Sequence, residues 1–524
     1  MSCQAKIQKN MKITNLCGMA ALFMAALTAV CSAQDNPVVS KLFSDHMVLQ
    51  REMPVPVWGT AKSGTRVTVK FGPQEKTAEA DKDGKWIIRL DTLKASSAPA
   101  ELLISSATGN QPVKIADVVV GDVYLCSGQS NMAFTMNELR AAEDMAKANF
   151  PVIRHSRCGD GWAVCSPATI GEFSGVGFYF ARKLVQETGI PIGLLNNAVS
   201  GSPIEQWIES EGFKGAPTLR NLELKRMATY RKAIASQLAD VDTWLAAARE
   251  ATATGKDFPA QPKPPDNNNP NYGGLYGYTE RLIPFAIRSM LWYQGESNGD
   301  DSDALYLEKL KALINGWRKV WNQGDFPVCI VQLASYMNSN PNPEGDDGWA
   351  GVRMAQLKCL GSIKNTGLAV IIDIGEPGNI HPPNKLDTGT RLALWALATN
   401  YGRKDMAYSG PLYKGMKVEG NKIRITLDHV GKGLMVGSKK DQAPVQEVPG
   451  GKLKQFALAS SDPAAPKGLK WFWAEALIDG ETVVISSSSV ANPVAVHYAY
   501  SRNPEGCNLY NKDGLPASPF RTED

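Results

Sequence analysis

The sequence predicts an α/β protein of three parts, in which a central domain with a mostly parallel sheet lies between two β-rich regions. Three observations predict it. Short β-type runs separated by turn residues fill residues 34–115, apolar strands alternate with helical segments over residues 116–405, and β-type runs return over residues 406–524. A chain of 524 residues is long enough for more than one hydrophobic core.

Residues 1–33 have the pattern of a secretory signal peptide. Three lysines precede an apolar run from Cys17 to Val30, and small residues close the segment at Ala33. The run is too short to span a membrane comfortably, and no later stretch reaches about 18 apolar residues. We therefore expect a secreted or periplasmic protein without an integral membrane segment, and a lipid anchor at Cys31 is the alternative.

The composition excludes several functional classes. Removal of the leader takes away three lysines and no acidic residue, which lowers the formal net charge from +4 to +1. Nucleic-acid binding needs concentrated positive charge, so no nucleic-acid partner is expected. No cysteine pair has the C-x-x-C spacing of a zinc site, and no metal is expected. Cys158 and Cys165 could form a disulfide in an oxidising compartment or remain thiols.

The N-terminal region is predicted to be a small β-sandwich. Its β-type runs are separated by Gly, Asp and Pro turns, and no helical pattern intervenes. The runs are VPVWGT, TRVTVKFG, KWIIRL and AELLISS. From about Met406 a second β-rich accessory region follows, with the runs NKIRITLDHV, KLKQFALAS, ETVVISS and PVAVHYAY.

The central region is predicted to contain βαβ units, because apolar strands alternate with helical segments. The strands are VVVGDVYLC, PIGLLNNAV, AIRSMLWYQ, VCIVQLAS and GLAVIIDIG. A helical insertion interrupts them at about residues 208–280. Within it, residues 218–254 carry helix formers at helical spacing, and we expect this helix to pack on the domain. Residues 261–274 are too rich in Pro, Asn and Gly for regular structure.

Chemically useful side chains follow the predicted strands of this sheet. Ser130 comes after the first strand, Gly201 after the second, Gln294 with Glu296 after the third, and His381 after the last. In an open α/β sheet, ligands bind beyond the carboxyl ends of the strands, where loops and helix N-termini converge. A hydroxyl, a glycine, an amide, a carboxylate and an imidazole at one rim are the groups that acyl transfer requires.

Ser130 and His381 form the predicted catalytic pair. A serine hydroxyl is a weak nucleophile until a base removes its proton, and histidine suits that work near neutral pH. Of the five histidines, only His381 follows a strand of the predicted sheet. Ser130 could instead be the N-cap of the helix that follows it, although a nucleophile also gains from a helix N-terminus. The segment GQSNM lacks the second glycine of the G-x-S-x-G elbow, which argues against an α/β-hydrolase.

The oxyanion of an acyl-transfer intermediate needs hydrogen-bond donors placed where the negative charge develops. We expect the backbone N–H groups of Ser130 and Gly201 to supply them, together with a side-chain amide from Gln294 or Asn298. Gly201 could also be an ordinary turn glycine.

Four motifs, GQSNM, AVSGSPIEQW, WYQGESN and NIHPPNK, together resemble the sialate O-acetylesterase group of the SGNH hydrolases. The correspondence runs from SDHMVLQR at residues 44–51 to NLYNKDGLPASPFRT near the end of the chain. The resemblance implies a flavodoxin-like SGNH domain with β-rich accessory regions. It also implies the removal of acetyl groups from carbohydrates without a metal or another cofactor. On this basis Ser130 is the nucleophile, His381 is the base, and Gly201 with an amide of WYQGESN forms the oxyanion hole.

The sequence departs from the SGNH pattern at the catalytic acid. Such enzymes usually place Asp three residues before the histidine, where this chain has Gly378. A carboxylate is still wanted to hold the imidazole and to stabilise its charged form. Glu296 resembles the glutamate with this role in related acetylesterases, and Glu376 and Asp373 are alternatives. A dyad whose histidine is oriented by a backbone carbonyl is a further alternative.

Aromatic residues near the motifs are candidates for sugar contacts, because one side of a pyranose is apolar. We expect most of them to lie in the core, and retain Trp207 as the candidate for a cleft wall. Arg391 and Lys385 could meet the carboxylate of an acidic sugar, or could simply be solvated or paired.

A second functional hypothesis is a carbohydrate-binding or adhesion protein whose central domain is inert. The absence of Asp before His381 favours it. A lipase is disfavoured, because the sequence has no long apolar lid segment.

Overall fold

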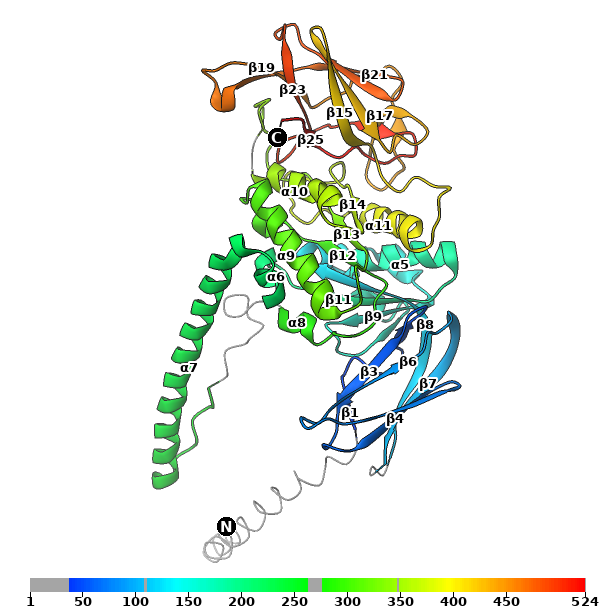
Figure 1. Cartoon of the computed structure of the whole chain (residues 1–524), viewed down its shortest axis with the longest axis vertical. Helices are drawn as coiled ribbons and strands as arrows, with labels where there is room; N and C mark the ends of the chain where they lie inside the picture. The colour runs from blue at the N-terminus through cyan, green and yellow to red at the C-terminus, as the bar shows by residue number, and fades with distance from the viewer. Residues whose placement is uncertain (1–36, 108–110, 263–275, 346–347, 524) are drawn as a thin grey trace, which may run out of the picture.

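The computed structural model describes residues 37–107, 111–262, 276–345 and 348–523. Figure 1 shows a central α/β region between an N-terminal β-rich region at the bottom and a C-terminal β-rich region at the top. The predicted α/β class with additional β-rich regions is confirmed. The expected signal peptide lies outside the described residues. No helix in the described ranges has the length and apolar character needed to cross a membrane.

The central sheet contains six parallel strands, and β10 (Ala163–Cys165) joins their edge antiparallel to β9. In sheet order the parallel strands are β9 (Phe150–Arg157), β11 (Ile192–Ala198), β8 (Val113–Gly128), β12 (Ser289–Tyr293), β13 (Val328–Val331) and β14 (Thr366–Ala369). Strands β12 and β13 are buried along their whole length, as apolar runs are when helices cover both faces of a parallel sheet.

Helices cover both faces of this sheet. On one face, α5 (Gly175–Thr188) and α11 (Lys385–Asn400) share a core with the inward side chains of β8 and β12. On the other face, α9 (Asp303–Trp321) and α10 (Gly348–Ser362) pack with Trp292 of β12. The chain passes from β8 to β11 on one side of β8 and later to β12 on its other side. In doubly wound sheets, ligands bind at the carboxyl ends of the strands beside such a reversal, which here is the end of β8.

The N-terminal region continues into the central sheet through β8 itself. The first part of β8 pairs with β2 (Val48–Gln50) and β7 (Ser96–Ser106), and its second part pairs with β11 and β12. The expected boundary at residues 115 and 116 therefore falls inside one strand. The remaining strands of the region are β1 (Val38–Val39), β3 (Val55–Thr60), β4 (Arg66–Phe71), β5 (Gln74–Glu79) and β6 (Lys85–Leu90).

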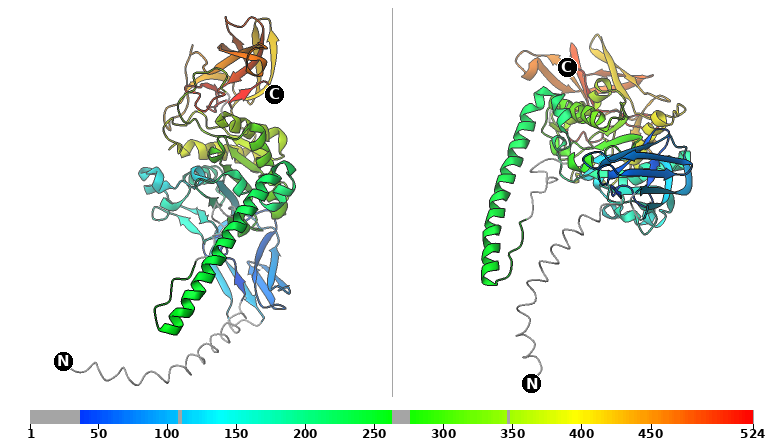
Figure 2. Two further views of the ribbon diagram at one scale, coloured as in Figure 1. Left: turned by 90° about the vertical axis from the view of Figure 1, so that its left-hand side faces the viewer. Right: turned by 60° about the horizontal axis from the view of Figure 1, so that its bottom comes forward.

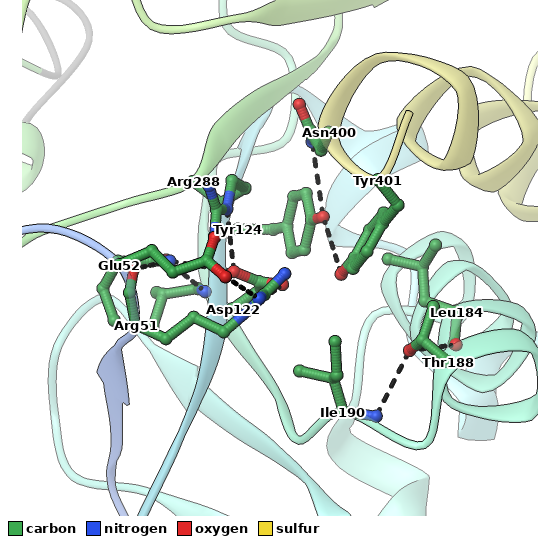
Figure 3. Close-up of polar contacts among 12 residues, drawn as sticks. Arg51, Glu52, Asp122, Tyr124, Leu184, Thr188, Ile190, Arg288, Asn400 and Tyr401 are labelled. Atoms are coloured by element: carbon green, nitrogen blue, oxygen red, sulfur yellow. Dashed lines mark hydrogen bonds and ion pairs between the residues drawn. The ribbon is translucent and has the colours of Figure 1, made fainter. Parts of the chain in front are cut away.

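Asp122 ties the N-terminal region to the central sheet. It lies within β8, is fully buried, and accepts hydrogen bonds from Arg51 Nε at 3.0 Å and Arg288 Nε at 2.8 Å. Gln50 Nε2 donates to the same carboxylate at 2.9 Å. Figure 3 shows the two guanidinium groups converging on Asp122 from different segments of the chain. A buried carboxylate is tolerated because these partners compensate its charge.

The insertion after Trp207 forms α6 (Ser210–Lys214), α7 (Arg220–Thr254) and α8 (Tyr276–Glu280). The expected helix is present, but the expectation that it packs on the domain is wrong. Figures 1 and 2 show α7 projecting away from the body of the protein. Its apolar residues do not gather on one face, and Leu224, Leu238 and Leu245 are exposed. Most of the segment expected to be irregular lies outside the described residues.

The C-terminal region contains two four-stranded sheets that share one core. The first is β15 (Leu412–Glu419), β16 (Lys422–Asp428), β22 (Thr482–Ser486) and β21 (Glu475–Asp479). The second is β20 (Leu469–Trp473), β19 (Phe456–Ser461), β23 (Pro493–Tyr498) and β25 (Phe520–Arg521). The buried Arg353 of α10 donates to the carbonyl oxygens of Ser501 and Arg502, which fastens this region to the central one. Cys158 and Cys165 are both free thiols.

Candidate active site

Ser130 and His381 meet at the carboxyl end of β8. Ser130 Oγ lies 2.8 Å from His381 Nε2, although the two residues are 251 positions apart in the chain. Ser130 is the first residue of α2 (Ser130–Ala133), and His381 lies in the loop between β14 and α11. The structure therefore brings together the two residues that the strand-end pattern selected.

Gly128 allows the chain to turn sharply between β8 and Ser130. Its φ is +135°, and a Cβ atom at this position would lie 2.0 Å from the carbonyl oxygen of Tyr293. The next residue, Gln129, donates its backbone N–H to that same carbonyl at 3.0 Å. Only glycine fits this close approach of two strands. The turn leaves Ser130 with a backbone N–H that has no acceptor within α2.

Three contacts hold the loop that carries His381. Asn379 Oδ1 accepts the backbone N–H of His381 at 2.9 Å, and Asn131 Nδ2 donates to the carbonyl oxygen of Ile380 at 2.9 Å. The ring of Phe134 stacks on the imidazole, with centroids 5.2 Å apart and planes inclined by 24°. The pKa of His381 is lowered by partial burial and by the nearby charge of Lys385, while Glu138 opposes the shift. This lowered pKa favours the neutral imidazole, which is the form that acts as a general base.

None of the three candidate carboxylates contacts the imidazole. Glu296 Oε1 accepts from Asn131 Nδ2 at 2.5 Å, and Glu376 accepts from Asn379. Asp373 is held by both terminal nitrogens of Arg391, at 2.6 and 2.8 Å. Within the described ranges, the hydrogen bond to Ser130 is the one that the His381 ring makes. The expected contact between Glu296 and His381 is not present, because Asn131 lies between Glu296 and the loop.

Glu296, Asn131 and Lys385 form a hydrogen-bonded network next to Ser130, because Asn131 is the residue that follows the serine. Lys385 is fully buried, and its Nζ donates to Asn131 Oδ1 at 2.5 Å. The ammonium also lies 5.4 Å from the ring centre of Tyr293 and 5.7 Å from that of Phe134, within cation–π range. Burial lowers the pKa of Lys385 to about 7, against the opposing effect of Glu296. Burial also raises the pKa of Glu296, while the hydrogen bond from Asn131 and the charge of Lys385 oppose that shift.

The side-chain amides expected to donate to the oxyanion, those of Gln294 and Asn298, instead donate hydrogen bonds to other protein groups. Gln294 is fully buried, and its Nε2 lies 2.8 Å from Asn298 Oδ1 and 3.1 Å from Gln129 Oε1. Asn298 Nδ2 donates to Asp301 at 2.9 Å and to Glu205 at 3.0 Å. The structure thus places both amides in a network that joins the strand-end loops, and their hydrogens already have acceptors.

Gly201 lies in the exposed turn that follows β11. Its φ is +72°, a left-handed conformation that favours glycine, and nothing lies within 4 Å of a Cβ atom built there. The open space above the turn leaves its backbone accessible to a ligand.

Trp207 does not form a cleft wall, and that expectation is wrong. The side chain is fully buried, Nε1 donates to Ser202 Oγ at 3.0 Å, and the ring packs edge-on against Trp292 and Trp317. A tryptophan near a motif is drawn into the core because its large apolar area gains most from burial. Arg391, also buried, is committed to Asp373 and is not available to a sugar carboxylate.

Sequence reasoning missed Asn131, Phe134 and Asn379 as parts of the site, and it considered Lys385 only as a contact for a sugar carboxylate. Asn131 and Lys385 both lie inside quoted motifs, GQSNM and NIHPPNK. Their position in these motifs was the available signal, but no local pattern indicates that they contact each other.

Comparisons with known proteins place the chain among carbohydrate esterases. A family model described as carbohydrate esterase, sialic acid-specific acetylesterase, matches residues 120–239 and 272–384, which include Ser130 and His381. The chain is 26% identical over 532 residues to a sialate O-acetylesterase of Rattus norvegicus, covering 91% of this chain and 92% of the other. It is also 26% identical over 533 residues to the sialate O-acetylesterase of Homo sapiens, covering 91% of each. A solved structure, a carbohydrate acetylesterase from Xanthomonas citri, matches with a TM-score of 0.74. Its sequence identity is 32%, over 93% of this chain and 99% of that one.

Proposed function

This chain belongs to the sialic acid-specific acetylesterase family of carbohydrate esterases, and from that premise we propose that Ser130 and His381 remove O-acetyl groups from carbohydrates. The observation that carries the proposal is the 2.8 Å contact between Ser130 Oγ and His381 Nε2. This distance lies within the range for direct proton transfer between a nucleophile and its base. The leader pattern of residues 1–33 supports a secreted or periplasmic location.

The strand order supports a flavodoxin-like SGNH architecture for the central region. Without β9, the sheet order β11-β8-β12-β13-β14 corresponds to second, first, third, fourth and fifth strand along the chain. This is the doubly wound order in which ligands bind at the reversal beside the first strand. Ser130 follows that strand directly.

The reaction proceeds in two acyl transfers. His381 Nε2 accepts the hydroxyl proton while Ser130 Oγ attacks the acetyl carbonyl carbon, and the carbonyl oxygen becomes an oxyanion. The backbone N–H groups of Ser130 and Gly201 are the donors proposed for that oxyanion. His381 then gives the proton to the departing sugar oxygen, which leaves an acetyl group on Ser130. Water, activated by the same imidazole, attacks this acetyl-serine and releases acetate.

We propose that contacts to the loop and to the imidazole face orient His381, and that no carboxylate bonded to the ring does so. Asn131, Asn379 and Phe134 restrain the loop and the imidazole, and Glu296 acts on His381 through Asn131. Correct placement of a base accounts for much of the effect of an orienting carboxylate, because small displacements of reacting groups are costly. Catalysis is therefore proposed to use a Ser130–His381 dyad.

The test is hydrolysis of p-nitrophenyl acetate by the wild type and by Ser130→Ala. The variant is expected to lose at least about a thousandfold in kcat, because the nucleophile is removed. Ser63→Ala, at an exposed position of the N-terminal region, is the matched control and retains full activity. Equal hydrolysis by Ser130→Ala would refute the mechanism. The inert glycan-binding alternative requires that the wild type itself shows no hydrolysis. Acetate release from a panel of O-acetylated glycans then identifies the sugar.

A further inference from the structure

One face of the sheet β20-β19-β23-β25 carries a row of side chains that the central site does not use. Trp473 pairs with Ala457, Ala457 pairs with His497, and His497 pairs with Arg521. Paired residues of neighbouring strands point to the same face of a sheet.

A second tryptophan lies on the same face. Trp471 lies two residues before Trp473 on β20 and pairs with Ala459. Its indole stacks on the imidazole of His497, with ring centroids 3.6 Å apart. Trp473 lies at the end of the edge strand, and 46% of it is exposed. Its exposed ring offers an apolar face on which a ligand can stack.

A cavity of about 420 Å³ opens on this face, within the size range of small-molecule sites. Trp471 and Tyr500 supply its aromatic wall, while Glu344 and Glu523 supply carboxylates. His497 Nε2 contacts Glu523 Oε1 at 2.5 Å, yet His497 Nδ1 and Glu523 Oε2 have no hydrogen-bond partner in the described structure. The imidazole side chain is only 4% exposed, so a buried ring nitrogen at this cavity retains unused hydrogen-bonding capacity.

One loop connects this cavity to the loop of His381. In the segment after β13, Met337 donates its backbone N–H to the carbonyl of Pro377 at 2.9 Å, four residues before His381. Farther along the same segment, Pro341 accepts a hydrogen bond from Trp473 Nε1 at 3.1 Å, and Glu344 lines the cavity. A polymer lying in the cavity therefore contacts a segment that also contacts the catalytic loop.

We propose that an aromatic groove binds sugar units of the glycan chain whose acetyl ester reacts at Ser130. The groove consists of this cavity, with Trp471, Tyr500, Glu344 and Glu523 in its lining, and of Trp473 beside it on the same face of β20. The proposal rests on the proposed function for the identity of the ligand as a carbohydrate. The apolar C–H face of a sugar ring packs on an aromatic face, and its hydroxyls donate to carboxylates. The lining carries Lys467 and Arg521 as well as the two glutamates, and Arg521 is bound to Asp303 at 2.9 Å, so the groove has no excess positive charge and suits neutral sugar units.

The experiment compares Trp473→Ala with the wild type on two substrates of different size. Acetylated xylan extends beyond the catalytic serine, whereas p-nitrophenyl acetate does not. Trp473→Ala is expected to raise KM for acetylated xylan about tenfold and to leave kcat/KM for p-nitrophenyl acetate unchanged, because stacking on one aromatic ring is lost. Trp473→Phe retains an aromatic face and is expected to restore most of the affinity.

Leu477→Ala is the matched control, since Leu477 is 67% exposed on the other sheet of the same region. Affinity electrophoresis through deacetylated xylan and deacetylated glucomannan measures binding without catalysis. Retardation of the wild type and of Leu477→Ala, but not of Trp473→Ala, supports the groove. Equal retardation of all three proteins, or of none, overturns it. If the wild type is retarded by the glycans but hydrolyses no ester, the result counts against the proposed function and not against the groove. The electrophoresis measures binding independently of Ser130.

Discussion

Asn131 donates its side-chain amide to the carbonyl oxygen of Ile380, so the residue after the nucleophile holds the residue before the base. The same amide group contacts Glu296 through Nδ2 and Lys385 through Oδ1. One side chain therefore connects the helix of Ser130, the loop after β12 and the start of α11. These segments come from distant parts of the chain. The distance between Ser130 and His381 therefore depends on the contacts that the Asn131 side chain makes.

Replacement of Asn131 by alanine is expected to lower kcat for p-nitrophenyl acetate about 10- to 100-fold with little change in KM. The base would no longer be held against Ser130, and a displacement of about 1 Å costs on that order. Steady-state kinetics measure the effect. Asn137→Ala on the neighbouring helix, where Asn137 bonds the exposed Glu172, is the control and keeps kcat. An unchanged kcat in Asn131→Ala would remove Asn131 from the positioning of His381.

The pH profile of kcat/KM is expected to fall on the acid side with a midpoint below about 6.5, the ordinary pKa of histidine. His381 works as a base only when neutral, and its pKa is lowered, so activity is lost only as the pH falls through this lowered value. A midpoint above 6.5 for the wild type would contradict the environment found for His381.

Two charge variants should move this midpoint in opposite directions. Lys385→Met removes a cation that lowers the pKa of His381, so the acid limb moves to higher pH. Glu138→Gln removes an anion that raises the same pKa, so the limb moves to lower pH. Glutamine retains an acceptor for the Thr135 backbone N–H, which Glu138 accepts at 2.7 Å. If the midpoint of the acid limb moves in the same direction in both variants, the charges of Lys385 and Glu138 do not control it.

Replacement of Asp122 by alanine is expected to destabilise the protein by about 3 to 5 kcal/mol, because it leaves the guanidinium groups of Arg51 and Arg288 without their shared buried partner. Urea unfolding measures the loss, and the activity of the remaining folded protein should be preserved. Glu101→Gln, at an exposed ion pair with Lys114, is the control and changes stability by less than about 1 kcal/mol. Equal stability of the two variants would contradict the role of Asp122 in fastening the N-terminal region.

The α/β class and the meeting of Ser130 with His381 followed from the sequence by itself. Both depend on local rules: apolar runs alternate with helical segments, and the carboxyl ends of parallel strands lie at one rim. A residue directly after such a strand must lie near that rim, whatever the details of the loops. The same rule placed Gly201 in the turn after β11.

Tertiary structure alone decided which groups surround that pair. Glu296 follows β12 at the predicted rim, but its carboxylate accepts a hydrogen bond from Asn131 and does not contact the imidazole. Asn131 in turn contacts the loop of His381. Trp207 is the last residue of the motif AVSGSPIEQW, yet its side chain packs in the core against the indoles of Trp292 and Trp317. Periodicity along a strand or helix is set by neighbouring residues, whereas a hydrogen bond requires two atoms within about 3 Å. That distance is fixed by the packing of segments hundreds of residues apart, which no local pattern encodes.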